Sequence, residues 1–185
     1  MNLSEIYEDA ERRMKSAVET TRKELSHLRA GRANPALLER VQVMAYDTVM
    51  PLNQVASIST PDAKTLVVQP FDKGNLAAIE RGILKSDLGL TPASDGRVIR
   101  LNIPALTDDR RAELTKVVHK MAEEGKVSLR NVRRDANEHI KKMEKDKQIS
   151  EDERFKALDK TEKILDKYSE EIDKLSGAKI DEIKG

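Results

Sequence analysis

Four basic side chains on one predicted helix face are the residues whose type and spacing favour a specific chemistry. They step by three or four positions along a proline-free stretch and so share one side of a helix: Lys126, Arg130, Arg133 and Arg134. Arginine occupies three of these four positions, and its planar guanidinium suits paired hydrogen bonds to phosphate oxygens. Asp135 and Glu138 are the only acids between positions 126 and 142, so little of this charge is cancelled within the run. Contact with RNA phosphates is therefore predicted.

A charged helix face also has a more ordinary explanation. Most charge runs are solvated surfaces, and their partners are acids on neighbouring helices. The preference for arginine over lysine and the shortage of acids within the run favour RNA contact over that explanation. Arg29 and Arg32, together with the pair Arg110 and Arg111, flank two predicted linkers and are expected to form a second basic cluster where two domains join.

No pattern in the chain predicts catalysis or metal binding. The three histidines, His27, His119 and His139, are scattered, and neither an H-E-x-x-H pair nor a G-x-x-x-x-G-K-[ST] loop occurs. Cysteine is absent, which excludes thiolate metal sites and cysteine nucleophiles. The acids interleave with lysine and arginine at helical spacing, as they do on a solvated surface. We expect a non-enzymatic protein with no catalytic residue, no metal site and no cofactor.

Composition limits the compartment and the class of protein. Charged residues make up 36% and aromatic residues 3% of the 185 positions, a profile typical of long, exposed helices. The formal net charge is only +1, so any surface that binds nucleic acid must be local. The absence of cysteine fits a reducing compartment, the acidic N-terminus is unlike a signal peptide, and no apolar run is long enough to span a bilayer. A cytoplasmic protein without membrane contact is expected.

Three long amphipathic helices are predicted from apolar residues at three- and four-residue steps. The first covers Leu3–Leu28, the second follows a Thr107 cap as far as Lys147, and the third opens at a capping box, Ser150–Glu153. The short link between the last two makes them an antiparallel hairpin. The expected stripes are, in chain order, Ile6, Ala10, Met14, Ala17, Thr21, Leu25 and Leu28; Leu114, Val118, Met121, Gly125, Leu129, Val132, Ala136, Ile140 and Met143; and Phe155, Leu158, Leu165, Ile172 and Ile183.

The middle of the chain changes to a strand-like period. Short β-branched or alternating runs are expected to form strands: Val41–Val43, Val55–Ser59, Thr65–Gln69 and Val98–Ile103. Between the third and fourth runs, Asn75 is expected to cap a helix that continues to Ser86. Its apolar side is Leu76, Ile79, Ile83 and Leu84. The pattern predicts a small β/α/β domain.

The predicted architecture is an α+β fold in which one domain is inserted into another. An isolated amphipathic helix cannot bury its stripe, so the first helix is expected to pack on the C-terminal hairpin. This closes an elongated three-helix bundle from residues 1–30 and 106–185, and residues 31–105 form the inserted domain. Both linkers leave and re-enter the bundle at one end, which predicts a hinge at Ala30, Gly31, Pro104, Ala105 and Leu106.

Four segments closely resemble the bacterial ribosome recycling factor family. They occur in the family's order and spacing: Leu28–Pro35 (LRAGRANP), Ser86–Leu90 (SDLGL), Pro104–Thr107 with Arg110 and Arg111, and Arg130–Asn137 (RNVRRDAN). The match spans the chain, and Asp146–Lys147 with Ile149–Asp152 resembles the family's turn between helices. The resemblance implies an L-shaped molecule, in which a hinged β/α/β domain is joined to the three-helix bundle.

The expected function comes from this resemblance. The family binds the post-termination 70S ribosome, lays its bundle along large-subunit RNA, and splits the subunits together with elongation factor G and GTP. Carried onto this chain, the likeness implies these rRNA-binding residues: Arg133 above all, then Arg130 and Arg134, with Arg29 and Arg32 at the junction. Lys126 joins them as a member of the same helix face, and the chain is expected to be a monomer. The residues alone leave one alternative, a coiled-coil scaffold or chaperone-like module that binds protein and uses its arginines only for solubility.

Overall fold

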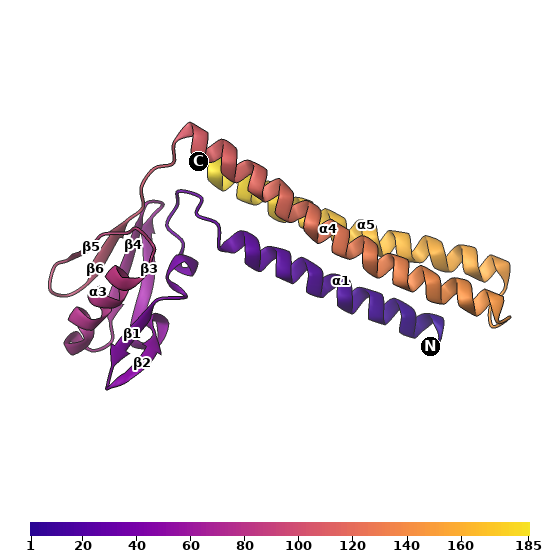
Figure 1. Cartoon of the computed structure of the whole chain (residues 1–185), viewed down its shortest axis with the longest axis horizontal. Coiled ribbons are helices and arrows are strands. Elements are labelled where there is room, and N and C mark those ends of the chain that lie inside the picture. The colour runs from indigo at the N-terminus through magenta and orange to yellow at the C-terminus, as the bar shows by residue number, and fades with distance from the viewer. The chain divides into compact units, whose positions relative to one another are not determined.

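The computed structural model describes all 185 residues, and these divide into two compact units (Figure 1). Unit 1 consists of Met1–Leu28 and Ala112–Asp181 and holds the greater part of three long helices. Unit 2 consists of Arg29–Arg111 and Glu182–Gly185 and contains both β-sheets. No helix combines the length and the apolar composition that a membrane span requires.

The three long helices were predicted and are present: α1 (Leu3–Ser26), α4 (Asp108–Lys145) and α5 (Glu151–Lys184). The helix α1 opens with a capping box, in which Asn2 Oδ1 accepts a hydrogen bond from the Glu5 amide at 2.8 Å and the Glu5 carboxylate accepts one from the Asn2 amide at 2.9 Å. Such reciprocal bonds satisfy two amides that the helix itself leaves without acceptors.

The predicted caps of α4 and α5 are also confirmed. Thr107 Oγ1 accepts a hydrogen bond from the Arg110 amide at 3.1 Å. Ser150 Oγ accepts one from the Glu153 amide at 3.1 Å, and the Glu153 carboxylate accepts one from the Ser150 amide at 3.3 Å. These side-chain caps could be predicted from sequence because both partners of each hydrogen bond lie three positions apart in the chain.

Two predicted helix ends are wrong by two residues. The helix α1 ends at Ser26 instead of Leu28, because the amides of His27 and Leu28 bond to carbonyls only three residues back and tighten the last turn. The helix α4 ends at Lys145 instead of Lys147, because Lys147 adopts a left-handed φ of +59° that starts the turn into α5.

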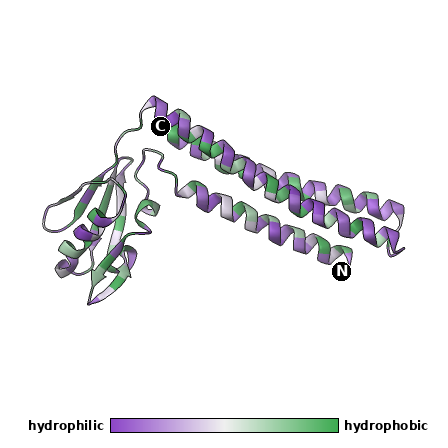
Figure 2. Cartoon of the chain, in the orientation of Figure 1, coloured by the Kyte–Doolittle hydropathy of each residue, from purple (hydrophilic) through white to green (hydrophobic).

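The core of unit 1 lies where the apolar stripes of the three amphipathic helices meet, and Figure 2 shows hydrophilic and hydrophobic residues mixed along each of them. A hydrogen bond of 2.7 Å from Thr161 Oγ1 to Asn137 Oδ1 links α5 to α4. Burial raises the pKa of the Tyr168 hydroxyl. The buried residues include Ile6, Ala10, Met14 and Val18 of α1; Leu129, Val132, Ala136 and Ile140 of α4; and Ala157, Ile164, Leu165 and Ile172 of α5.

Two predicted core positions are wrong. Phe155 is 58% exposed, because at about 100° per residue it points roughly 100° away from Ile172, and Ala157 takes the core position in its place. In α4, Ala122 is buried whereas Met121 is only half-buried. These two positions flank the centre of the stripe at similar angles, so the spacing of apolar residues does not choose between them.

Unit 2 is built on an antiparallel sheet of four strands in the order β3–β4–β6–β5. These strands are β3 (Ala56–Asp62), β4 (Thr65–Pro70), β5 (Pro92–Ser94) and β6 (Ile99–Asn102). A separate hairpin pairs β1 (Gln42–Ala45) with β2 (Thr48–Pro51), and α3 (Leu76–Lys85) packs against β1. Three short turns complete the unit: η1 (Pro35–Leu38), α2 (Leu52–Val55) and η2 (Lys73–Asn75).

The four predicted strands are present as β1, β3, β4 and β6, whereas β2 and β5 were not predicted. The strand β2 exists because the chain reverses at Tyr46 and Asp47, which take φ values of +52° and +60° and close a two-residue hairpin. Aspartate tolerates left-handed backbone, but tyrosine does not favour it and the turn lacks glycine and asparagine, so the sequence signals this hairpin only weakly. The strand β5 is only three residues long and lies at the edge of the sheet.

Two details predicted for α3 are wrong. Asn75 makes no side-chain cap; instead Asp72 Oδ1 accepts a hydrogen bond from the Gly74 amide at 2.9 Å and caps η2, which leads directly into α3. Leu84, expected on the apolar side, is 59% exposed, while Ile79 and Ile83 are fully buried. A helix of ten residues buries only a narrow stripe against one strand, and Leu84 falls outside it.

The close contact of α4 with α1 and α5 at Gly125 can be tested through its effect on stability. A Cβ at Gly125 would overlap the Thr21 hydroxyl of α1 and lie 3.0 Å from Ile172 Cδ1 of α5, whereas a Cβ at Gly177 meets nothing within 4 Å. We expect Gly125→Ala to lower the free energy of unfolding by about 1–3 kcal/mol through overpacking. The matched variant Gly177→Ala should raise it by about 0.5–1 kcal/mol, because alanine favours the helix.

Urea denaturation followed by circular dichroism measures both changes. Adding Thr21→Ala should recover part of the loss in Gly125→Ala, since it removes the hydroxyl that the new methyl group meets. Equal effects of the two glycine substitutions would contradict a close helix contact at Gly125.

Candidate nucleic-acid interface

The four predicted RNA-binding residues lie on the surface of α4, within unit 1. The side chains of Lys126, Arg130 and Arg133 are 27%, 42% and 30% exposed, so their stems pack against neighbouring residues while their charged ends reach solvent. Arg134 is exposed. The helix thus presents all four cations to solvent, but to different extents.

Three of these cations have carboxylate partners. Lys126 Nζ lies 2.5 Å from Asp173 Oδ1, and Arg133 Nη1 donates a hydrogen bond of 2.8 Å to Glu162 Oε2; both acids belong to α5. Arg130 Nη2 lies 2.5 Å from Glu123 Oε1 in the same helix. The predicted shortage of acids within the run therefore does not leave these cations unpaired. The run between positions 126 and 142 contains few acids, but the antiparallel α5 supplies others from a distant part of the sequence.

Arg134 has no carboxylate partner. Its Nη2 donates a hydrogen bond of 2.9 Å to Asn131 Oδ1, a neutral acceptor. Lys141 lies seven residues further along the same side of α4, is exposed and forms no ion pair. The uncompensated positive charge of the predicted face is therefore centred on Arg134 and Lys141, beside the ion-paired Arg133.

The same stripe of α4 contains three exposed lysines that sequence reasoning missed. At about 100° per residue, Lys116, Lys120 and Lys145 lie within roughly 40° of the direction of Arg134, and none of them forms an ion pair. Basic residues four, seven or eleven positions apart lie on the same side of a helix, so a search of the sequence for these spacings would have found the three lysines. They were missed because Glu123 and Glu138 interrupt the stripe.

The arginines of the predicted second cluster lie in unit 2. Arg29 and Arg32 are exposed and form no ion pair, whereas Arg111 Nη1 lies 3.5 Å from Asp108 Oδ1. Arg29, Arg32 and Arg110 line a common pocket of about 230 Å³. These three predicted cations are therefore brought together.

The predicted hinge residues differ in their packing. Gly31 has a left-handed φ of +73°, and a Cβ there would lie 2.9 Å from Leu106 Cγ, so the two linkers touch at this point. Ala30 is only 6% exposed, whereas Pro104 and Ala105 are exposed. The first linker is therefore buried at Ala30, whereas the second is exposed to solvent at Pro104 and Ala105.

The turn between β3 and β4 holds both linkers to unit 2. The Ala33 amide donates to the Ala63 carbonyl at 2.7 Å, the Ile103 amide to the Lys64 carbonyl at 2.8 Å, and Lys64 Nζ to the Gly31 carbonyl at 3.1 Å. Asp62 orders this turn by accepting a hydrogen bond from the Lys64 amide, which lowers the pKa of its carboxyl group.

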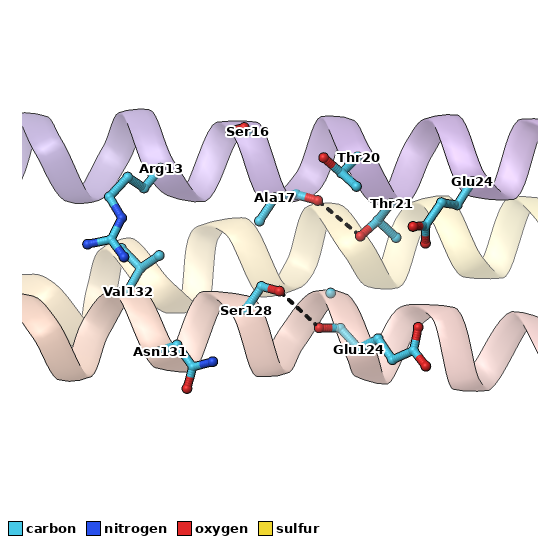
Figure 3. A pocket seen from close by; sticks show the side chains of 11 residues that line it. Arg13, Ser16, Ala17, Thr20, Thr21, Glu24, Glu124, Ser128, Asn131 and Val132 are labelled. Carbon is cyan, nitrogen blue, oxygen red and sulfur yellow. Dashed lines mark hydrogen bonds between the residues drawn. The ribbon is translucent and has the colours of Figure 1, made fainter.

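A polar groove of about 590 Å³ lies between α1 and α4 (Figure 3). Two of its hydroxyl groups are engaged by their own helices: Thr21 donates to the Ala17 carbonyl at 3.0 Å and Ser128 to the Glu124 carbonyl at 3.3 Å. Arg13 at one end donates to Asp135 at 2.8 Å. The groove contains no nucleophile paired with a base, and no group of three or more acids or histidines in the chain could hold a metal ion.

The fold and this surface define an α+β protein that combines a long three-helix bundle with a small β-sheet unit and carries a basic stripe on its central helix. The chain belongs to the ribosome recycling factor family, whose model, described as "Ribosome recycling factor", matches residues 21–183. The family consists of non-enzymatic translation factors that act in ribosome recycling.

Relatives and solved structures agree over nearly the whole chain. The ribosome-recycling factors of Symbiobacterium thermophilum and Carboxydothermus hydrogenoformans are 56% and 54% identical; the alignments cover 97% of both chains in the first case and 98% of both in the second. A solution structure of a ribosome recycling factor matches with a TM-score of 0.79 and 42% identity, over 100% of this chain and 98% of the other. Models for the T. thermophilus ribosome recycling factor and the E. coli elongation factor G bound to the E. coli post-termination complex match with a TM-score of 0.72 and 43% identity over both full chains.

The ion pair between Arg133 and Glu162 should contribute little to folding. Both side chains are partly exposed, and such pairs are worth about 0.2–1 kcal/mol in double-mutant cycles. We expect Arg133→Ala, Glu162→Gln and the double variant to unfold within about 1 kcal/mol of wild type, with a coupling energy in that range. Thermal melts monitored by circular dichroism measure it. A loss of several kcal/mol in either single variant would show that the pair is structural.

Proposed function

We propose that this chain binds the post-termination ribosome in the cytoplasm and, with elongation factor G and GTP, splits it into subunits. The observation that carries the proposal is the likeness, over both full chains, to a recycling factor described with elongation factor G on the post-termination complex. Identity above 50% over 97% of the chain to recycling factors supports the same role. The partners are thus the 70S ribosome and elongation factor G, and the chain acts as a monomer.

The bundle contacts large-subunit rRNA through the basic surface of α4 in this proposal. Arg133, Arg130, Arg134 and Lys126 supply phosphate contacts on the bundle, and Arg29 and Arg32 supply them from unit 2. The exposed guanidinium of Arg134, which has no carboxylate partner, supports this assignment most directly. Guanidinium groups bind phosphate through two parallel hydrogen bonds, and each such contact releases counter-ions from the RNA.

Ribosome binding by alanine variants tests the rRNA contact. We expect Arg133→Ala and Arg134→Ala each to weaken binding by about 1–3 kcal/mol, the range for charge-assisted hydrogen bonds. Each should also flatten the dependence of log K on log salt, because one fewer phosphate is neutralised. Arg133→Lys should restore only part of the affinity, since lysine keeps the charge and loses the planar fork.

The matched control is Lys15→Ala, which removes one exposed, unpaired cation from α1 instead of α4. Binding is measured by co-sedimentation with 70S ribosomes over a salt series, and subunit splitting by light scattering after addition of elongation factor G and GTP. If both α4 variants behave like Lys15→Ala, the face is a solubilising surface, as expected for a coiled-coil scaffold or chaperone-like module.

We also propose that the domains predicted at residues 1–30 with 106–185 and at 31–105 move about a hinge at Ala30, Gly31, Pro104, Ala105 and Leu106. The exposure of Pro104 and Ala105 supports it. The anchoring of Ala33 and Ile103 to the β3–β4 turn limits the free segments to residues nearer the bundle. Such a hinge lets one domain stay bound while its partner is displaced.

Single-molecule fluorescence tests the hinge, and the absence of cysteine makes specific labelling simple. We expect a dye pair at Asn53→Cys and Lys145→Cys, one in each domain, to give a broad distribution of transfer efficiency in the free chain. A control pair at Lys15→Cys and Lys145→Cys, both in the bundle, should give a narrow distribution. Equally narrow distributions would show that the domains do not move.

A further inference from the structure

We propose that Glu162 and Asp173 of α5 are specificity-determining residues. They hold Arg133 and Lys126 in intramolecular ion pairs that rRNA phosphates must replace, and they thereby weaken binding to RNA in general. This inference rests on the proposed contact between α4 and rRNA, and it assigns a role to the acids beside that contact instead of to its cations.

The two ion pairs form a regular set along the seam between α4 and α5. Lys126 and Arg133 are seven residues apart in α4, which returns them to the same side after two turns. Asp173 and Glu162 are eleven residues apart in the antiparallel α5, which does the same after three turns. Each acid therefore faces one cation across the seam, at 2.5 Å for Asp173 and Lys126 and at 2.8 Å for Glu162 and Arg133.

The exposure of these groups allows the acids to be exchanged for phosphate. The side chains of Glu162 and Asp173 are 49% and 60% exposed, whereas those of Arg133 and Lys126 are 30% and 27% exposed. The cations are held by their packed stems and the acids are free to swing into solvent. Arg133 uses only one of its five N–H donors on Glu162, so a phosphate can approach the others before the carboxylate leaves.

A carboxylate in this position discriminates between RNAs. Any phosphate that approaches Arg133 or Lys126 meets a negative charge a few ångströms away, which offsets part of the attraction. An RNA that contacts only this seam gains little from the exchange. An RNA whose shape also reaches Arg134 and Lys141 gains phosphate contacts with cations that form no ion pair in the free chain. The acids thus penalise partial contacts more than the complete one, as in other surfaces that reject wrong partners by like charge.

Neutral, nearly isosteric variants test the role of the acids, and α5 offers matched controls. Glu162→Gln and Asp173→Asn each remove one negative charge and release one cation. Glu170→Gln and Asp166→Asn remove the same charge from exposed positions that form no ion pair. The comparison therefore separates the release of a cation from the change in net charge.

The measurements are affinity for a non-ribosomal RNA duplex over a salt series, and competition of that duplex against 70S ribosomes. We expect Glu162→Gln and Asp173→Asn each to raise duplex affinity roughly threefold to tenfold at low salt, and to steepen the slope of log K against log salt by about one unit. The duplex should displace ribosomes from the double variant at a lower concentration than from wild type. The control variants should change duplex affinity by less than twofold.

Two kinds of result would overturn the proposal, and a third would overturn the proposed function instead. The duplex affinity of Glu162→Gln could equal that of the Glu170→Gln control. It could also fall below the wild-type affinity, which would make Glu162 a residue that positions Arg133 for binding. A gain that persists in Arg133→Ala would show that the acid does not act through that arginine. Failure of wild type to bind ribosomes would contradict the proposed function instead, and the duplex measurement would still report on the acids.

Discussion

Burial of three apolar stripes is the constraint on which the rest of unit 1 depends. Helices in proteins owe most of their stability to the packing of an apolar face, and α1, α4 and α5 each bury such a stripe against the other two. Gly125 allows a close contact among the three helices, because its missing side chain leaves room for Thr21 and Ile172. Once the stripe of α4 is turned inward, its opposite side faces solvent, and Arg134 and Lys141 lie there as a consequence.

The same packing decides which charges are neutralised. The antiparallel course of α5 brings Glu162 and Asp173 beside Arg133 and Lys126, and the resulting seam is nearly neutral although α4 itself is basic. A chain with a net charge of +1 can therefore contain a basic helix without a large positive field. Partly exposed ion pairs contribute little to stability, so these acids are better understood through binding than through folding.

Unit 2 shows how a small sheet can order two linkers. The β3–β4 turn receives hydrogen bonds from Ala33 and Ile103, and Lys64 reaches the Gly31 carbonyl. Gly31 is required there for two reasons: its φ is left-handed, and Leu106 occupies the space that a side chain would need. The chain is thus held by hydrogen bonds at Gly31, Ala33 and Ile103 and is exposed at Pro104.

The sequence by itself determined the features that depend on neighbours within a few residues. The three long helices, the caps at Thr107 and Ser150, four strands and the cation-rich side of α4 follow from periods and short motifs. Only the tertiary structure decided what depends on distant segments. The β1–β2 hairpin closes through left-handed backbone at Tyr46, and the partner of Arg133 lies 29 residues away in another helix. Periodicity fixes which side of a helix is apolar, but packing of remote segments fixes which charges meet.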